Sequence, residues 1–185
     1  MTIALTIRER RSIHTFRKDP VPRELITELL NDAVWAPNHG LREPWRFIYA
    51  DGEGKGRLVD GLFELYEKNG ELNGMAPEQK EKFKRSTLDV PAYLLVVMKE
   101  DPRPDIWEED FAAVACLIQN FQLLGWEKGL GMLWNTGSLL YMPPFRRMAG
   151  VEPGEKIAGI LSIGYFDKAP KARPRTPAEE RLTFL

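Results

Sequence analysis

Cysteine and histidine are scarce in this chain of 185 residues. Because Cys116 is the single cysteine, an internal disulfide and a cysteine-based metal cluster are excluded. Its thiol lies in an apolar helical pattern, so we expect it to be buried. His14 and His39 are the only histidines, and their spacing to carboxylates does not indicate a metal site. We therefore assign no metal ligands.

Long apolar runs and a strong net charge are also missing. No apolar run approaches the roughly 18 residues that indicate a membrane helix. Charged residues come too early in MTIALTIRERR, residues 1–11, for a signal peptide. The 26 Lys+Arg and 27 Asp+Glu leave a net charge of -1, which gives no global basicity for nucleic-acid binding. We expect a cytoplasmic protein that binds neither membranes nor nucleic acids.

Recognisable catalytic motifs are absent as well. There is no G-x-S-x-G nucleophile motif and no P-loop. The run GEGKGR, residues 52–57, follows a predicted strand, but Arg57 stands where a dinucleotide fingerprint needs its third glycine. We expect a surface turn there, and we assign no side chain a catalytic role.

The apolar share of the chain, 43%, is enough for the core of a single domain over residues 1–185. Apolar spacing predicts helices over 2–11, 23–37, 77–88, 105–129 and 143–150, and one after the glycine turn within 52–70. Strands are predicted over 45–51, 92–100, 130–137 and 156–166. The runs 92–100 and 156–166 have the pattern of strands buried on both faces. This order indicates an α/β or α+β sandwich, a sheet flanked by helices.

Two segments point beyond the core of one chain. The helix over 105–129 is the longest and is largely apolar, which indicates burial in the core or in a dimer interface. The tail after residue 166 is rich in proline and basic residues and cannot form a core, so it packs on something else or is mobile. Within the tail, Arg173 and Arg175 share one side of an extended segment. They either grip one anion together or form a solvated basic tail.

The stretch RERRSIHTFR, residues 8–17, concentrates basic side chains. Arg10 and Arg11 offer planar forks of donors that suit phosphate oxygens. Ser12 and His14 add two further donors. The alternative is a solvated basic face with Ser12 as a helix cap.

Two further stretches carry specialised residues. In GMLWNTG, residues 131–137, glycines allow backbone N–H groups to approach a planar ligand closely, although a buried strand with a polar exit turn explains the same letters. In APNHGLREPWRF, residues 36–47, one connection holds a histidine, two arginines, two prolines and a tryptophan. Pro37 stops the preceding helix, and Pro44-Trp45 introduces the next strand.

The order of these stretches resembles the FMN-dependent nitroreductase family. The motifs are an RRS cluster after the first helix, AP-x-H-x-x-x-x-PW-x-F after the second, W-x-TG after the long helix, IGY at the end of the last strand and R-x-R-x-P in the tail. The resemblance runs from Arg10 to about Glu180, and the short length is similar to the compact bacterial branch.

The resemblance implies an α+β, three-layer sandwich with a central, mostly antiparallel sheet flanked by helices. It also implies a homodimer formed through the long helix, with tail residues 170–185 packed on the partner subunit and two FMN molecules at the interface. The cofactor-binding residues it implies are Arg10, Arg11, Ser12, His14, His39, Arg42, Trp134, Asn135, Thr136, Gly137, Arg173 and Arg175.

Within that set the resemblance assigns separate roles. Residues 10–12 hold the phosphate and ribityl chain, residues 134–137 line the flavin ring, and the tail arginines close over the phosphate. His39 and Arg42 belong to a loop that faces the flavin, with His39 supplied by the partner subunit. His14 departs from the family pattern, because some members carry a lysine there, near the reducible end of the flavin. A protonated histidine could still stabilise the anionic reduced ring.

The implied function is an NAD(P)H oxidoreductase that passes a hydride through FMN to a nitroaromatic, quinone or similar acceptor by ping-pong kinetics. Three alternatives stay open. One is a dehalogenase-like or flavin-fragmenting enzyme on the same fold, and another is a protein that binds or stores FMN. The third is a flavin-free interaction module whose basic patches bind an anionic partner.

Overall fold

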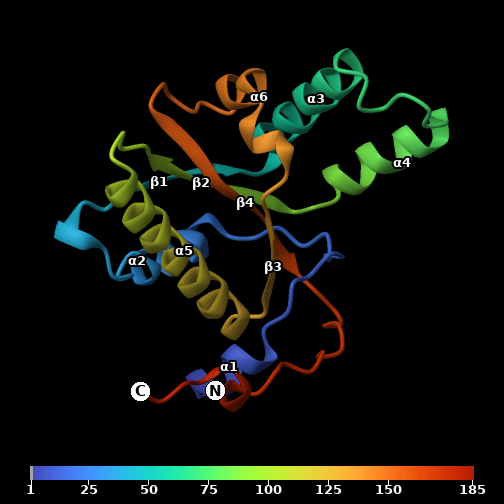
Figure 1. Ribbon diagram of the computed structural model, residues 1–185. Coiled ribbons are helices and arrows are strands. Elements are labelled where there is room, and N and C mark those ends of the chain that lie inside the picture. The colour runs from blue at the N-terminus through green and yellow to red at the C-terminus, as the bar shows by residue number, and fades with distance from the viewer. Residues whose placement is uncertain (1) are drawn as a thin grey trace.

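A four-stranded antiparallel sheet forms the centre of the computed structural model, which describes residues 2–185 (Figure 1). The strand order is β1-β2-β4-β3. The strands are β1 Trp45–Ala50, β2 Ala92–Lys99, β3 Leu130–Asn135 and β4 Glu155–Tyr165. All three pairings are antiparallel, with Trp45 opposite Met98 at one edge and Asn135 opposite Ile160 at the other. The four predicted strands are therefore confirmed within one or two residues at each end.

Helices cover both faces of this sheet. They are α1 Ile3–Glu9, α2 Arg23–Ala33, α3 Gly52–Lys68, α4 Pro77–Leu88, α5 Pro104–Glu127 and α6 Pro143–Met148, with short 3₁₀ turns η1 His39–Leu41, η2 Ser138–Tyr141 and η3 Ala178–Arg181. One face carries α2 and α5, and the other carries α3 and α6 (Figure 1). The α+β, three-layer arrangement is confirmed.

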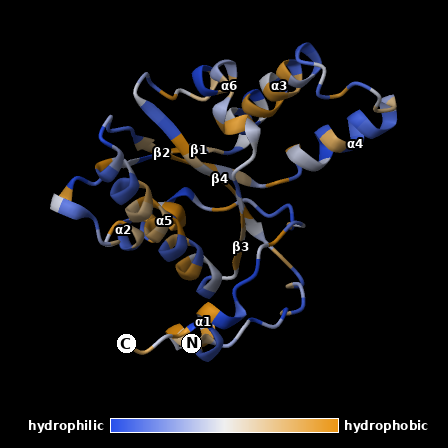
Figure 2. Cartoon of the chain, in the orientation of Figure 1, coloured by the Kyte–Doolittle hydropathy of each residue, from blue (hydrophilic) through white to orange (hydrophobic). Residues whose placement is uncertain are grey.

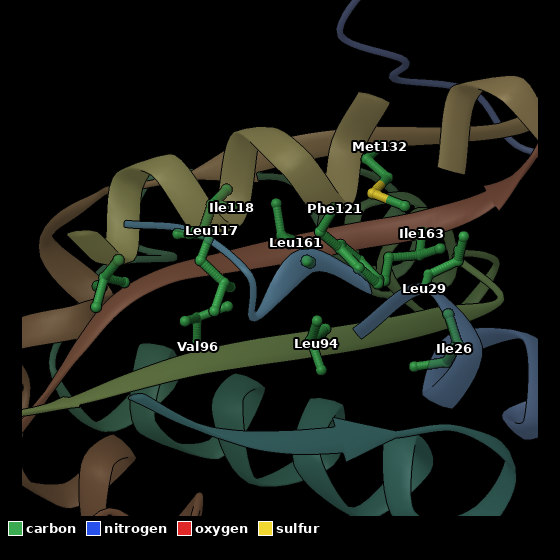
Figure 3. Packing of buried hydrophobic residues seen from close by; sticks show 14 of the residues in the cluster. Ile26, Leu29, Leu94, Val96, Leu117, Ile118, Phe121, Met132, Leu161 and Ile163 are labelled. Atoms are coloured by element: carbon green, nitrogen blue, oxygen red, sulfur yellow. The ribbon is translucent and has the colours of Figure 1, made fainter. Parts of the chain in front are cut away.

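The alternation of side chains along β2 divides the core into two clusters. Leu94 and Val96 face α2 and α5, whereas Leu95 and Val97 face α3 and α6. Figure 3 shows the first cluster, in which Phe121 of α5 packs over the sheet. Both central strands, β2 and β4, are buried on both faces, as their continuous apolar runs predicted.

The long helix α5 has an inward and an outward side. Val114, Leu117 and Phe121 are fully buried against the sheet. Cys116 is exposed, so the prediction of a buried thiol is wrong for the single chain. The reason is the helical period, which turns residue 116 away from the sheet although its neighbours in sequence are apolar. Figure 2 shows that apolar residues cover much of α5.

The glycine run 52–57 is not a surface turn. It forms the first turns of α3, with the amide of Lys55 donating to the carbonyl of Asp51. Buried Val59 and Leu62 hold this helix on the sheet, and that packing overrides the weak helix propensity of glycine. Lys55 also donates from Nζ to the carbonyls of Leu88 and Val90, each at 2.7 Å, and so attaches α3 to the end of α4.

The tail runs back across the view toward α1 (Figure 1), and Arg175 of the tail is close enough to Arg10 to affect its pKa. Residues 170–185 are exposed throughout and contain only the short turn η3. Leu182 and Phe184 are among the exposed large apolar side chains. Within residues 2–185, no helix is both long and apolar enough to span a bilayer.

Candidate functional site

The segment after α1 lies along the outer edge of β3. Ser12 forms a parallel bridge with Met132, and the amide of Ile13 donates to the carbonyl of Met132 at 3.1 Å. Because Ile13 is buried, Ser12 and His14 on either side of it point outward and are exposed. A Cβ at Gly131 would lie 2.5 Å from Ile13 Cγ1, so glycine permits this close approach.

Three arginines meet at the start of this segment. Arg10 donates from Nη1 to Oε1 of Gln122 on α5 at 3.5 Å, and its Nε is buried with no hydrogen-bond partner. Burial lowers the pKa of Arg10, and the charges of Arg11 and Arg175 lower it further. Within residues 2–185, no carboxylate forms an ion pair with any of the three. The cluster is therefore a concentration of uncompensated positive charge.

The bonds that Arg11 and Arg175 make are to backbone carbonyls. Arg11 Nη1 donates to the carbonyls of Arg8 at 2.5 Å and Arg10 at 2.8 Å. Arg175 Nη1 donates to the carbonyls of Arg173 at 3.1 Å and Pro174 at 3.3 Å. Arg175 is close enough to lower the pKa of Arg10, and the carbonyl of Arg173 accepts a bond from Arg175; both tail arginines are exposed.

The indole of Trp134 on β3 packs against the core cluster between the sheet and helices α2 and α5. Its Nε1 donates to the carbonyl of Ala158 at 3.4 Å, and its ring crosses Gly159 on the neighbouring strand. A Cβ at Gly159 would lie 1.9 Å from Nε1, so only glycine leaves room for the indole. The indole is fixed as a result, and beyond Met132 the outer edge of β3 pairs with no other strand of the described chain.

The side chain of Asn135 points to the opposite face. Its Nδ2 donates to Ser162 Oγ at 3.2 Å and to the carbonyl of Ile160 at 3.3 Å. Here the end of β3 borders a cavity of about 340 Å³. Its lining comes from α3, α4, β2, β3, β4 and the η2–α6 region and consists of Leu58, Val59, Leu62, Tyr66, Phe83, Thr87, Tyr93, Asn135, Thr136, Gly137, Leu139, Leu140, Phe145, Ile160 and Ser162. None of these side chains carries a formal charge at neutral pH.

His39 and Arg42 lie elsewhere. They precede β1, which forms the sheet edge opposite to β3. Arg42 donates to Asp110 Oδ1 from Nε at 3.0 Å and from Nη2 at 2.7 Å, and His39 Nδ1 lies 3.2 Å from Glu109 Oε2. The fold thus gathers residues 10–14, 134–137 and Arg175 at one sheet edge and places this pair at the other.

Several residues of the site escaped sequence reasoning. Gln122 and Asp110 are polar side chains on an apolar helix, and both are buried and bonded to arginines. An isolated polar residue on a buried helical face is the signal that could have found them. Ser162 and Phe83 carry no such signal, because only the packing of β4 and α4 brings them to the cavity.

Comparison with known proteins identifies the family of this chain. The model of the nitroreductase family matches residues 7–165. "Putative NAD(P)H nitroreductase YfhC" of Bacillus subtilis (strain 168) is 43% identical over 180 residues, covering 97% of this chain and 92% of that protein. The solved structure of a nitroreductase-like family protein from Bacillus cereus is 44% identical, has a TM-score of 0.87 and is covered to 96% by the whole of this chain.

A more distant structure shares the fold alone. The FMN and NADPH-dependent nitroreductase NfnB from Sphigopyxis sp. strain HMH has a TM-score of 0.77 at 19% identity, covering 100% of this chain and 99% of its own. The family match extends over most of the chain, and YfhC shares well over 30% of its residues along nearly the whole length. The chain therefore belongs to the nitroreductase family.

Proposed function

We propose that this protein is an FMN-dependent NAD(P)H oxidoreductase that reduces a nitroaromatic, quinone or similar flat acceptor. The observation that carries the proposal is the cluster of Arg10, Arg11 and Arg175, three cations gathered without a carboxylate partner. The nitroreductase names of YfhC and NfnB support the choice of reaction, and the dependence of NfnB on FMN and NADPH supports the cofactor and the reductant.

The arginine cluster fits the phosphate of FMN. A phosphate would accept hydrogen bonds from the unpartnered Nε of Arg10 and from the N–H groups of the neighbouring guanidiniums that do not bond to carbonyls. Its negative charge would also relieve the repulsion among the three arginines. Ser12 is exposed beside them and supplies a hydroxyl donor. Arg173, two residues before Arg175 on the tail, would close over the same anion.

The end of β3 fits the flavin ring. Trp134 is fixed by the core, and residues 135–137 offer backbone donors and acceptors at a strand edge that pairs with no other strand among residues 2–185. His14 lies outward on the adjacent segment, where its protonated form would add positive charge near a reduced ring. When bound, FMN supplies hydride chemistry between a nicotinamide and an acceptor.

The apolar cavity next to Asn135 supports the assignment of a flat acceptor. Its walls carry aromatic side chains from α3 and α4, including Tyr66 and Phe83, whose rings stack at 6.2 Å between centroids. Donor and acceptor would use this space in turn, which gives ping-pong kinetics. The lining offers no charged proton donor, so solvent would supply protons to the product.

We also propose that the active unit is a homodimer. His39 and Arg42 lie at the sheet edge away from the arginine cluster, so within one chain they do not complete the same site. The outward face of α5, with exposed Ala112 and Cys116, is suited to pairing two copies. The exposed tail, residues 170–185, would then pack on the partner subunit.

The test is the visible spectrum of the purified protein, followed by addition of NADH or NADPH without oxygen. We expect flavin absorption that bleaches with one of the two nucleotides and returns when a quinone or nitroaromatic is added. Bound flavin that neither nucleotide reduces would favour storage. Reduced flavin that only a halogenated aromatic reoxidises would favour a dehalogenase. A colourless protein that takes up no FMN would contradict the proposal and favour an anion-binding interaction module.

A further inference from the structure

The loop before β1 has an unusual backbone. Gly40, Leu41 and Glu43 have φ values of 61°, 51° and 44°, in the left-handed region. Leu41 and Glu43 are the only non-glycine residues with positive φ among residues 2–185. Such conformations are strained and persist where the surroundings hold them, often at binding sites.

Side chains on α5 hold this loop. The guanidinium of Arg42, between the two strained residues, donates twice to Asp110 Oδ1 and once to Glu109 Oε2. Asp110 is 5% exposed, so its carboxylate depends on this partner. Inside the loop, Asn38 Oδ1 accepts from the amide of Glu43 at 3.0 Å. The loop is therefore attached to α5 through Arg42 and is braced internally by Asn38.

The held loop presents its tip outward. Leu41 is 81% exposed, which is uncommon for a large apolar side chain in a strained conformation, and His39 is exposed beside it. By contrast, the guanidinium of Arg42 is turned back onto α5, where its Nε and Nη2 groups bond to the carboxylates of Asp110 and Glu109. An arginine in this state is a weaker ligand for a phosphate than a free arginine, because two carboxylates already neutralise its charge and the buried one would repel a second anion.

We infer that Arg42 is a positioning residue rather than a cofactor ligand. Its ion pair with Asp110 holds loop 38–43 in the left-handed form that sets the loop tip against the flavin site of a second subunit. The inference rests on the proposed function. It explains why a buried carboxylate on α5 and an arginine next to strained residues occur together in this chain.

Two substitutions separate the two roles of Arg42. As a positioning residue, Arg42 is needed together with Asp110, so Arg42→Gln and Asp110→Asn should each weaken FMN binding about tenfold, since the loop must be ordered on binding. The double variant should be no weaker than either single variant, because the amides of Gln and Asn can bond to each other. Were Arg42 a direct ligand, Asp110→Asn would free it, and FMN binding would be unchanged or tighter.

The measurements are the dissociation constant of FMN and hydrogen–deuterium exchange over residues 36–45. Exchange reports on the loop with or without flavin, so it should rise in both single variants. The matched control is Arg23→Gln, which removes an exposed ion pair with Asp51 and should change neither quantity. Melting temperatures show whether a variant is still folded. If Arg42→Gln is unfolded, the conservative variant Arg42→Lys is measured in its place.

Each outcome is decisive. Faster loop exchange with weaker FMN binding in both single variants supports the inference. Unchanged exchange in both single variants would show that the Arg42–Asp110 ion pair does not hold the loop. Weaker FMN binding in Arg42→Gln alone would show that Arg42 is a direct ligand of FMN. If the wild type takes up no FMN, the proposed function fails, and the positioning role fails with it even when the exchange shows that the clamp exists.

Discussion

Arg10 shows how position changes the chemistry of one side chain. Its guanidinium is half-buried beside Arg11 and Arg175, and burial followed by the two like charges lowers its pKa. A residue in this state gains more from a bound anion than a solvated arginine does, because desolvation and repulsion have already raised the free energy of the empty site. An arginine on a solvated surface would not have this preference for a bound anion.

The first prediction concerns Arg11. We expect Arg11→Ala to weaken FMN binding by about 1.5–3 kcal/mol, the usual loss for a hydrogen bond to a charged group, which is roughly 10- to 150-fold in the dissociation constant. The measurement is flavin fluorescence during titration. Arg57→Ala, which removes an exposed arginine on α3, is the control and should bind FMN normally. Equal flavin retention by Arg11→Ala and the wild type would remove Arg11 from the phosphate site.

A second prediction concerns the glycine under Trp134. Gly159→Ala places a methyl group 1.9 Å from the indole Nε1, and the ring is held by its hydrogen bond to Ala158. Overpacking of this kind costs about 1–3 kcal/mol, so the melting temperature should fall by roughly 2–12 °C. Gly137→Ala meets no atom within 4 Å and serves as the control, with a melting temperature near that of the wild type. A normal melting temperature for Gly159→Ala would mean that the indole is free to move.

At the scale of elements, an ion pair connects β1 to the start of β4 across β2. Arg46 on β1 donates from Nε to Glu155 Oε1 at 2.6 Å, and its Nη2 also reaches Glu155 and the carbonyl of Gly150. The hydrogen bond from Arg46 lowers the pKa of Glu155 below its ordinary value of 4.5, against the opposing effect of burial. Since the folded state favours the ionised carboxylate, this pair stabilises the fold above that value and loses its effect as the pH falls.

The corresponding prediction uses Arg46→Gln. Its free energy of unfolding should be lower than that of the wild type at pH 7, and the difference should shrink as the pH falls through 4.5 and below. Urea denaturation at several pH values measures it. Arg57→Gln breaks only an exposed pair with Glu53 and should show a small difference that does not depend on Glu155. If the difference in the free energy of unfolding between Arg46→Gln and the wild type stayed constant down to pH 3, Arg46 would contribute only through packing.

On the scale of the whole molecule, the outward face of α5 and the two sheet edges decide how copies of the chain could combine. Residues 10–14 and 134–137 lie at the β3 edge and loop 38–43 lies near the β1 edge, while α5 contacts both regions through Gln122 and Asp110. In the proposed dimer, two copies pair along α5, and the loop of one chain lies toward the arginine cluster of the other. One helix would then define both the interface and the site.

The prediction at this scale is that Ala112→Glu disrupts the dimer. A charge on the outward face of α5 would be buried without a partner in the assembly, at a cost of several kcal/mol. Light scattering after gel filtration should give twice the subunit mass for the wild type and a single subunit for the variant, with weaker FMN binding. Ala76→Glu, at the exposed start of α4, is the control and should stay dimeric. A dimeric Ala112→Glu would place the interface elsewhere.

Much of the fold could be read from periodicity. The continuous apolar runs at 92–100 and 156–166 predicted the central strands β2 and β4, because both faces of such a strand must be covered. Periodicity failed where tertiary contacts outweighed local propensity. Glycine at 52–56 suggested a turn, but packing of Val59 and Leu62 extends α3 to Gly52. It also misjudged Cys116, since apolar neighbours do not reveal which side of α5 a residue occupies.

The candidate site could likewise be predicted only in part from the sequence. Arginine clusters and the Trp-Asn-Thr-Gly stretch are visible in the letters, because the chemistry of phosphate and planar ligands requires such residues. The partners of those residues are not visible. Gln122 beside Arg10, Ser162 beside Asn135 and Asp110 beside Arg42 lie between 27 and 112 positions away in the chain.

The sequence by itself determined the sandwich of helices and strands, the family pattern and the kinds of side chain that can hold an anion. It could do so because burial and hydrogen-bonding chemistry act residue by residue along the chain. Only the tertiary structure decided that Arg10, Arg11 and Arg175 lie together with no carboxylate of residues 2–185 paired to them, and that Arg42 bonds to Asp110. Charge and desolvation depend on distances between residues far apart in sequence, and these distances exist only once the sheet has formed.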